Sequence, residues 1–116
     1  MRRNCSMNYK IEASSYFEHE LKRLAKHYPS FKNDYREFLI SLKENPWQGI
    51  DLGRNIRKIR IQISSKGKGK SGGARAITMN VLIDEENMKI RLLLLYDKKD
   101  ADNFDERALE EAIREF

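Results

Sequence analysis

Apolar residues follow a helical period in the first half of the chain. After a short alternating stretch over residues 9–13, which predicts a strand, apolar side chains recur every three or four positions over residues 15–28. Pro29 interrupts this pattern, which then resumes over residues 30–45 and ends before Pro46. The pattern predicts two helices packed as an antiparallel hairpin.

The period changes to two in the second half of the chain. Over residues 58–63 three isoleucines alternate with Lys58, Arg60 and Gln62, a pattern typical of a strand with one apolar and one cationic face. Residues 47–55, which precede this strand and contain two glycines, are expected to form a loop.

Two further strands and a helix are expected to complete the fold. The strands cover residues 74–84 and 88–96, with a tight turn at residues 84–87. Residues 92–96 are apolar at every position, so the last strand should be central in the sheet. A helix is predicted from about Asn103 to the C-terminus.

These elements follow the order β-α-α-β-β-β-α. They predict an α+β fold in which the helical hairpin packs on a largely antiparallel four-stranded sheet, with one C-terminal helix. With 116 residues the chain suffices for one domain, expected over residues 8–116, after a disordered lead at residues 1–7 in which either Met1 or Met7 is the start. A single cysteine, Cys5, is consistent with a reducing cytoplasm, and no apolar run is long enough for a signal peptide or membrane span.

Positive charge is concentrated in one segment. Residues 52–83 contain eight basic residues and no acidic one, whereas the whole chain carries a net charge of only +5. Within this segment, lysines alternate with glycines at residues 66–70, where the glycines give the backbone freedom to arrange lysines around a phosphodiester chain. A segment of one charge sign indicates binding to RNA or DNA.

The same lysine-glycine segment is not a nucleotide-binding P-loop. Gly69-Lys70-Ser71 matches the end of that motif, but the motif also requires a glycine at the position of Ser64. A P-loop also opens a helix, whereas the residues from Ala74 onward have the pattern of a strand. A solvated loop that serves only solubility remains the alternative to RNA binding.

Three segments resemble a known family. They are Leu52-Gly-x-x-Ile-Arg-Lys-Ile-Arg60, Gly67-Lys-Gly-Lys-Ser-Gly-Gly-Ala-Arg75 and Leu93-Leu-Leu-Tyr96-x-Lys98. Together they are similar to toxins of the RelE/ParE superfamily, near its HigB-like branch. The resemblance implies a microbial RNase-like fold and metal-free cleavage of messenger RNA on the ribosome, with no cofactor. It also implies contact with ribosomal RNA, neutralisation by a cognate antitoxin that is a small helix-turn-helix protein, and no membrane partner.

The resemblance also implies which residues act. Cleavage of RNA without metal needs a base for the ribose 2′-OH, cations for the phosphorane and an acid for the leaving oxygen. The only two histidines, His19 and His27, lie on the first predicted helix, far in sequence from the basic segment. The catalytic residues implied by the resemblance are therefore Lys58, Arg60, Arg75 and Lys98, and the RNA-binding residues are Arg57, Lys66, Lys68, Lys70 and Phe104.

Individual roles follow from side-chain chemistry. Arg75 offers two parallel donors to the scissile phosphate, and Lys98 is suited to stabilise developing charge or to donate a proton. Lys58 becomes a base if neighbouring cations lower its pKa, and Arg60 shares the phosphate contacts. Phe104 replaces a tyrosine that several relatives carry, so it can stack on a base but cannot transfer a proton.

Two alternatives remain from the sequence alone. A ParE-like inhibitor of DNA gyrase shares the fold, and a plain RNA-binding module shares the basic segment. The position of Arg75 also conflicts with simple strand alternation, which places it on the same face as Ile77 and Met79. Either a bulge near Gly72 and Gly73 redirects Arg75, or the expected register is wrong.

The basic segment predicts salt-dependent binding to single-stranded RNA. If about four phosphates are neutralised, log affinity should fall with log salt concentration at a slope of about −3, because counterions are released. Replacing Lys66, Lys68 and Lys70 by alanine should flatten this slope. Filter binding at several salt concentrations measures it, and a slope near zero in the unmodified protein would contradict an electrostatic contact.

Overall fold

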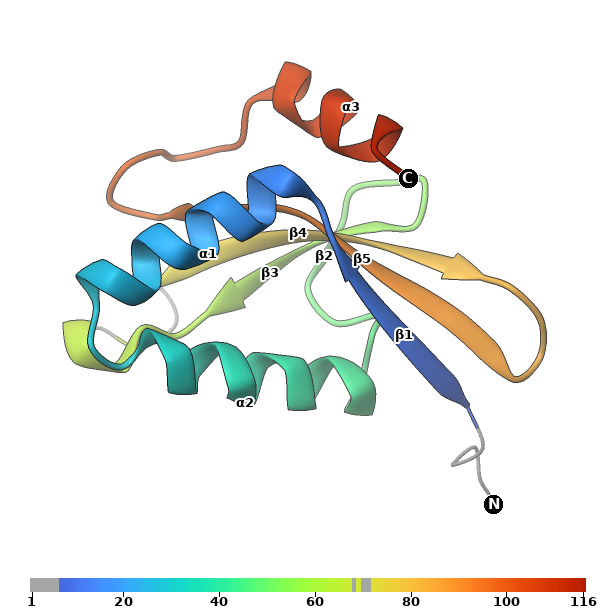
Figure 1. Ribbon diagram of the computed structural model, residues 1–116, viewed down its shortest axis with the longest axis horizontal. Helices are drawn as coiled ribbons and strands as arrows, with labels where there is room; N and C mark the ends of the chain where they lie inside the picture. Colours follow the sequence, from blue (N-terminus) through green and yellow to red (C-terminus); the bar gives the residue numbers. More distant parts are fainter. Residues whose placement is uncertain (1–6, 68, 70–71) are drawn as a thin grey trace.

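A five-stranded mixed sheet forms the centre of the molecule in the computed structural model, which describes residues 7–67, 69 and 72–116 (Figure 1). The strand order is β1-β5-β4-β3-β2. Strand β1 pairs with β5 in parallel, and the other neighbours are antiparallel. The strands are β1 (Asn8–Ala13), β2 (Ile50–Asp51), β3 (Ile56–Ile61), β4 (Ala74–Leu82) and β5 (Asn87–Asp97).

Two helices cover one face of the sheet. They are α1 (Ser15–His27) and α2 (Phe31–Glu44). Ser14 caps α1: its Oγ accepts from the backbone N–H of Phe17 at 3.0 Å and donates to the carbonyl of Leu93 at 2.6 Å, which also ties the helix to β5. The main core lies between these helices and the sheet, and its buried members include Phe17, Leu24, Phe31, Phe38, Leu42, Ile59, Ile61, Ile90 and Leu92.

A third helix, α3 (Glu106–Arg114), covers part of the opposite face. The strands therefore run between α2 and α3 in Figure 1. A second apolar cluster lies under α3 and contains Ile56, Ile77, Leu93, Leu94, Leu109 and Ala112. The register between β4 and β5 shifts where Ile77 pairs with Leu94 and Thr78 pairs with Leu92. This bulge leaves Leu93 as an extra residue in β5, so that Leu93 and Leu94 both belong to the second cluster.

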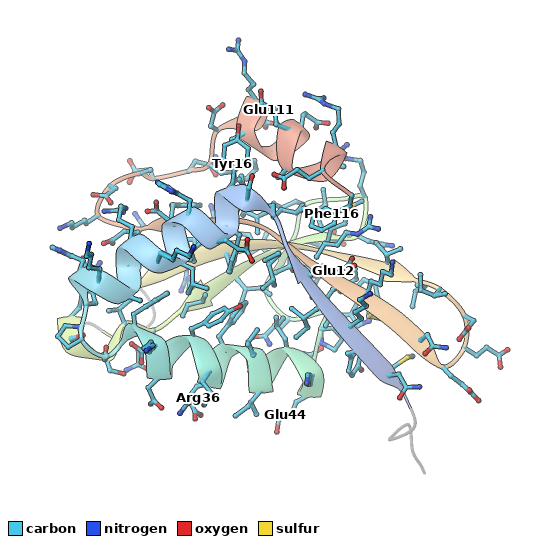
Figure 2. The ribbon with its side chains drawn as sticks, in the orientation of Figure 1. Glu12, Tyr16, Arg36, Glu44, Glu111 and Phe116 are labelled. Atoms are coloured by element: carbon cyan, nitrogen blue, oxygen red, sulfur yellow. The ribbon has the colours of Figure 1, made fainter. Side chains whose placement is uncertain are left out.

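Polar contacts fasten α3 to α1. The hydroxyl of Tyr16 is hydrogen-bonded to Glu111, toward which it points in Figure 2. The carboxylate of Glu115 accepts from both the backbone N–H and the hydroxyl of Ser15, at 2.9 and 2.8 Å. Glu115 thereby satisfies a free N–H at the start of α1, so the two helices are joined at their ends.

The observed architecture confirms the expected α+β fold, with three differences. The predicted loop over residues 47–55 contains the two-residue strand β2, which is too short to show a period and makes the sheet five-stranded instead of four-stranded. Strand β4 rather than β5 is in the middle of the sheet, although β5 has a partner on each side. Helix α3 begins at Glu106, because Asp105 provides its cap by accepting from the N–H of Arg107. None of the described helices is long and apolar enough to cross a membrane.

The expected disordered lead lies outside the described residues except for Met7. That side chain is partly buried against the main core beside β1. Met7 therefore contacts the core, although it was expected to belong to the lead.

Gly73 is expected to be essential for the pairing of β3 and β4. A Cβ atom at this position would lie 2.0 Å from the carbonyl oxygen of Ile61, a backbone atom that cannot move without the sheet. We expect Gly73→Ala to lower the free energy of unfolding by about 2 kcal/mol or more. Gly53→Ala is the matched control, because no heavy atom lies within 4 Å and only the φ of +86° is unfavourable, costing about 1 kcal/mol. Equal losses in urea unfolding would contradict the proposed clash.

Candidate active site

The four predicted catalytic residues line one cleft of about 400 Å³ on the outer face of the sheet. It lies beyond the part of this face that α3 covers, where β3, β4 and the end of β5 meet. The cleft is lined by Gln48, Gly49, Ile50, Lys58, Ile59, Arg60, Arg75, Lys98 and Asp102. The only carboxylate among these lining residues is that of Asp102, so the cleft is strongly cationic.

Arg75 and Arg60 are direct cross-strand neighbours on β4 and β3. Arg75 is 5% exposed, and one of its guanidinium nitrogens donates to the carbonyl of Ala74 at 3.2 Å. Burial lowers the pKa of Arg75, and the charge of Arg60 lowers it further. Two like charges placed directly opposite one another destabilise a sheet, and an anion bound between them would relieve the repulsion.

The orientation of Arg75 requires neither a bulge at Gly72 and Gly73 nor a different register. Arg75 does share a face with Ile77, as alternation predicts, and Lys58 pairs with Ile77 on that face. The assumption that this face is apolar throughout was wrong. Its apolar part lies under α3, and its cationic part lies beside the segment that precedes α3, where Lys58 contacts Asn103.

Lys58 and Lys98 bring their ammonium groups to the cleft with weak partners. The Lys58 Nζ lies 3.4 Å from the amide oxygen of Asn103, and the Lys98 Nζ lies 3.2 Å from Asp102, whose side chain is 98% exposed. An exposed pair of this kind contributes at most about 1 kcal/mol. An incoming phosphate can therefore replace Asp102 as the partner of Lys98 at small cost.

Gly49 forms the wall of the cleft beside β3. Its φ is +91°, and a Cβ atom there would lie 2.4 Å from the carbonyl oxygen of Lys58. Arg57 holds this loop in place by donating to the carbonyl of Trp47 and, at 3.4 and 3.3 Å, to those of Gln48 and Gly49. Arg57, expected to bind RNA, is thus engaged in holding the loop and does not line the cleft.

Lys66, also expected to bind RNA, is engaged in a buried ion pair. Its Nζ lies 2.5 Å from Asp97, donates to the carbonyl of Gly72 at 2.8 Å and lies 5.3 Å from the ring centre of Tyr28. The side chain of Lys66 is 10% exposed and that of Asp97 only 1%. Lys66 therefore cannot be replaced without structural cost, contrary to expectation for a loop lysine. Lys68 and Lys70 lie outside the described residues.

Phe104 packs against the second apolar cluster and lines another cavity, of about 670 Å³, between α1 and the segment before α3. His19 lines that cavity too and does not line the cationic cleft. The described residues contain no group of three or more His, Cys, Asp or Glu side chains arranged to hold a metal ion.

Sequence reasoning did not single out Tyr96 as a site residue, which packs against the second apolar cluster and lines the same cavity as Phe104 but also borders the cationic cleft through Arg75. Tyr96 pairs directly with Arg75 across β4 and β5, and its buried hydroxyl has no hydrogen-bond partner among the described residues. Burial raises the pKa of Tyr96, while the charges of Arg75 and Lys98 act in the opposite direction. Its position two residues before Lys98 was the available signal, because alternate residues of a strand share a face.

Comparison with known proteins rests on structure alone. No family model matches the chain, and no curated protein matches it. Among solved structures it is similar to the Escherichia coli toxin RelE, in a double Arg-to-Ala mutant in the free state. The TM-score is 0.57 at 14% sequence identity, over 95% of this chain and 99% of that chain. At this identity the similarity establishes a RelE-like fold.

The contacts of the buried Asp97 carboxylate make the stability of the fold depend on pH. Burial alone would raise the pKa of Asp97, but hydrogen bonds from Lys66, Tyr28 and the N–H of Lys99, with the charge of Lys66, hold it below its usual range. A carboxyl group with a depressed folded-state pKa stabilises the protein above its unfolded pKa of about 3.9 and loses this contribution as pH falls through the folded value.

We expect Asp97→Asn to lower the free energy of unfolding by about 3 kcal/mol at pH 7, because Lys66 is left without a counterion. The difference from the unmodified protein should shrink between pH 5 and pH 3. Urea unfolding of both proteins at pH 7, 5 and 3 measures it. A difference that stays constant over this range would show that the ionised carboxylate is not the stabilising group.

Proposed function

We propose that this protein is the toxin of a toxin-antitoxin module and cleaves messenger RNA on the ribosome, as a metal-free endoribonuclease. The observation that carries this proposal is the convergence of Lys58, Arg60, Arg75 and Lys98 on one cleft. The RelE-like fold supports it, as does the resemblance of the three sequence segments to the HigB-like branch. Protein binding alone would not require four cations around one cleft.

The cleft suits phosphoryl chemistry driven by cations. Arg75 presents a guanidinium at the base of the cleft, where it would hold two oxygens of the scissile phosphate. Arg60, directly opposite, would bind the same phosphate from the β3 side. Together they would stabilise the additional negative charge of the phosphorane, and their fixed positions would require little reorganisation during the reaction.

Proton transfer is assigned to the lysines. Lys58 lies on the same strand and face as Arg60, and its amine would accept the 2′-OH proton. Lys98, at the other side of the cleft, would stabilise or protonate the leaving 5′ oxygen. The nucleotide flanking the scissile bond would lie on the outer surface of the sheet between these two lysines.

The same charge suggests how the protein is controlled. The proposed partners are messenger RNA, ribosomal RNA and a small helix-turn-helix antitoxin, all in the cytoplasm. An acidic antitoxin segment placed over Arg60, Arg75 and Lys98 would neutralise the like charges of the cleft and would be steered to it electrostatically.

Replacement of the cleft cations separates an enzyme from a binding protein. We expect Arg75→Ala and Lys98→Ala each to reduce ribosome-dependent cleavage by about 100-fold or more, equivalent to about 2.7 kcal/mol of barrier, and to abolish growth arrest. Arg75→Lys should recover little activity, because lysine keeps the charge but cannot form the bidentate contact of a guanidinium group with the phosphate. Primer extension on translated messenger RNA, with and without ribosomes, measures the cleavage.

Arg36→Ala is the matched control for loss of charge. Arg36 is exposed on α2 and points away from the sheet in Figure 2. This variant should retain full cleavage, and thermal melting should show that all variants are folded. Undiminished cleavage by both cleft variants would exclude Arg75 and Lys98 from the mechanism. Inhibition of gyrase supercoiling without any RNA cleavage would instead identify a ParE-like gyrase inhibitor.

A further inference from the structure

The buried cluster formed by Lys66, Asp97 and Tyr28 lies directly behind the proposed catalytic cleft. Asp97 is the last residue of β5, and Lys98 follows it in the chain. Asp97 pairs with Ala74, a member of the main core, whereas Tyr96 pairs with Arg75 on the outer face. The carboxylate thus points into the helix side of the sheet, while the ammonium of the next residue reaches the cleft on the other side.

Every oxygen of the Asp97 side chain is occupied in this cluster. One oxygen lies 2.5 Å from the Lys66 Nζ and accepts from the N–H of Lys99 at 3.1 Å. The other accepts from the hydroxyl of Tyr28 at 2.6 Å. These contacts connect the end of β5 to the segment after β3 and to the end of α1. Because the Asp97 carboxylate is buried and the Lys66 side chain is only 10% exposed, their ion pair is largely sheltered from water and restrains both residues, while Tyr28 is half-buried.

The backbone around Lys98 is fixed by the same group of contacts. The N–H of Lys98 donates to the carbonyl of Gly73 at 3.0 Å, and Lys66 holds the neighbouring carbonyl of Gly72 at 2.8 Å. After Lys98 the chain turns away from the sheet, with the N–H of Asp100 donating to the carbonyl of Asp97 at 2.9 Å. Lys66 therefore touches two of the chain segments that carry cleft residues: the approach to Arg75 and the end of β5.

We propose that Lys66 is a positioning residue for the cleft, and that through Asp97 it fixes the strand end from which Lys98 reaches the scissile phosphate. This inference rests on the proposed function. It assigns the lysine that begins the basic loop to the interior of the active-site framework, whereas its sequence context suggested contact with RNA. A catalytic ammonium must be held to within a fraction of an ångström. The end of β5 extends beyond its pairing with β1, which stops at Leu92, so the contacts of Asp97 help to hold it in place.

Lys66→Met tests this role, because methionine keeps most of the apolar length of lysine and removes the charge. We expect ribosome-dependent cleavage at saturating messenger RNA to fall by about tenfold. Affinity for single-stranded RNA and its salt slope should remain unchanged. A lysine that contacts phosphate directly would instead reduce the magnitude of the salt slope by about 0.7 when removed.

A double-mutant cycle with Lys98→Ala distinguishes positioning from a general loss of stability. If Lys66 acts through Lys98, adding Lys66→Met to Lys98→Ala should cause no further loss of cleavage. Losses that multiply would overturn the proposal, as would full cleavage by folded Lys66→Met or a lowered salt slope. Lys66→Met leaves the buried carboxylate of Asp97 without a counterion, and this variant is replaced by the double variant Lys66→Met/Asp97→Asn if it fails to fold. The double variant removes both charges and is measured in the same cleavage and RNA-binding assays.

The cleavage assays distinguish failure of the positioning role of Lys66 from failure of the proposed function. If Arg75→Ala and Lys98→Ala leave cleavage unchanged, the cleft is not the site of the reaction and Lys66 has no cleavage to position. If those variants lose cleavage while Lys66→Met keeps it, the proposed function stands and the positioning role is excluded.

Discussion

The short length of α3 determines where chemistry can occur on this fold. A helix of nine residues is about 14 Å long, whereas the eleven residues of β5 extend about 36 Å. One face of the sheet is covered by two longer helices, so β4 and β5 are largely apolar on that side, and its buried polar residues are Thr78, Asn80 and Asp97. On the other face α3 covers only the second apolar cluster. The rest of that face is open to solvent, so the strands there can carry polar side chains, and these line the cleft.

Placing cations on strands gives precision at an energetic cost. Arg60 and Arg75 cannot separate without breaking the register of β3 and β4, so their mutual repulsion is part of the folded state. The surrounding structure compensates through buried apolar area and through contacts such as the Lys66–Asp97 pair. The positions of these cations are thereby fixed without a ligand, which is the arrangement that would favour transition-state binding in the proposed reaction.

The sequence predicted the fold well because the relevant signals are local. Alternation in β3 and helical spacing in α1 and α2 are properties of neighbouring residues, and they gave the correct faces for Lys58 and Arg60. The role of Lys66 depends on a contact with a segment that is distant in the chain. The role of Arg57 depends on a loop that folds back onto β3. Lys66 meets Asp97 across 31 positions, and nothing in a lysine beside a glycine indicates burial. Arg75 was misjudged because alternation identifies a face but not which part of it a short helix covers.

The parallel pairing of β1 with β5 has a consequence for the synthesis of the protein. The pair joins Asn8 to Asn87, and Ser14 bonds to Leu93 at a separation of 79 residues. The first strand therefore has no partner in the sheet until β5 has been translated, and contacts of such long sequence separation are slow to form. The cleft also needs Lys98 and Asp102, which follow β5 in the chain. A nascent chain consequently lacks the complete cleft until β5 and the residues after it have been translated.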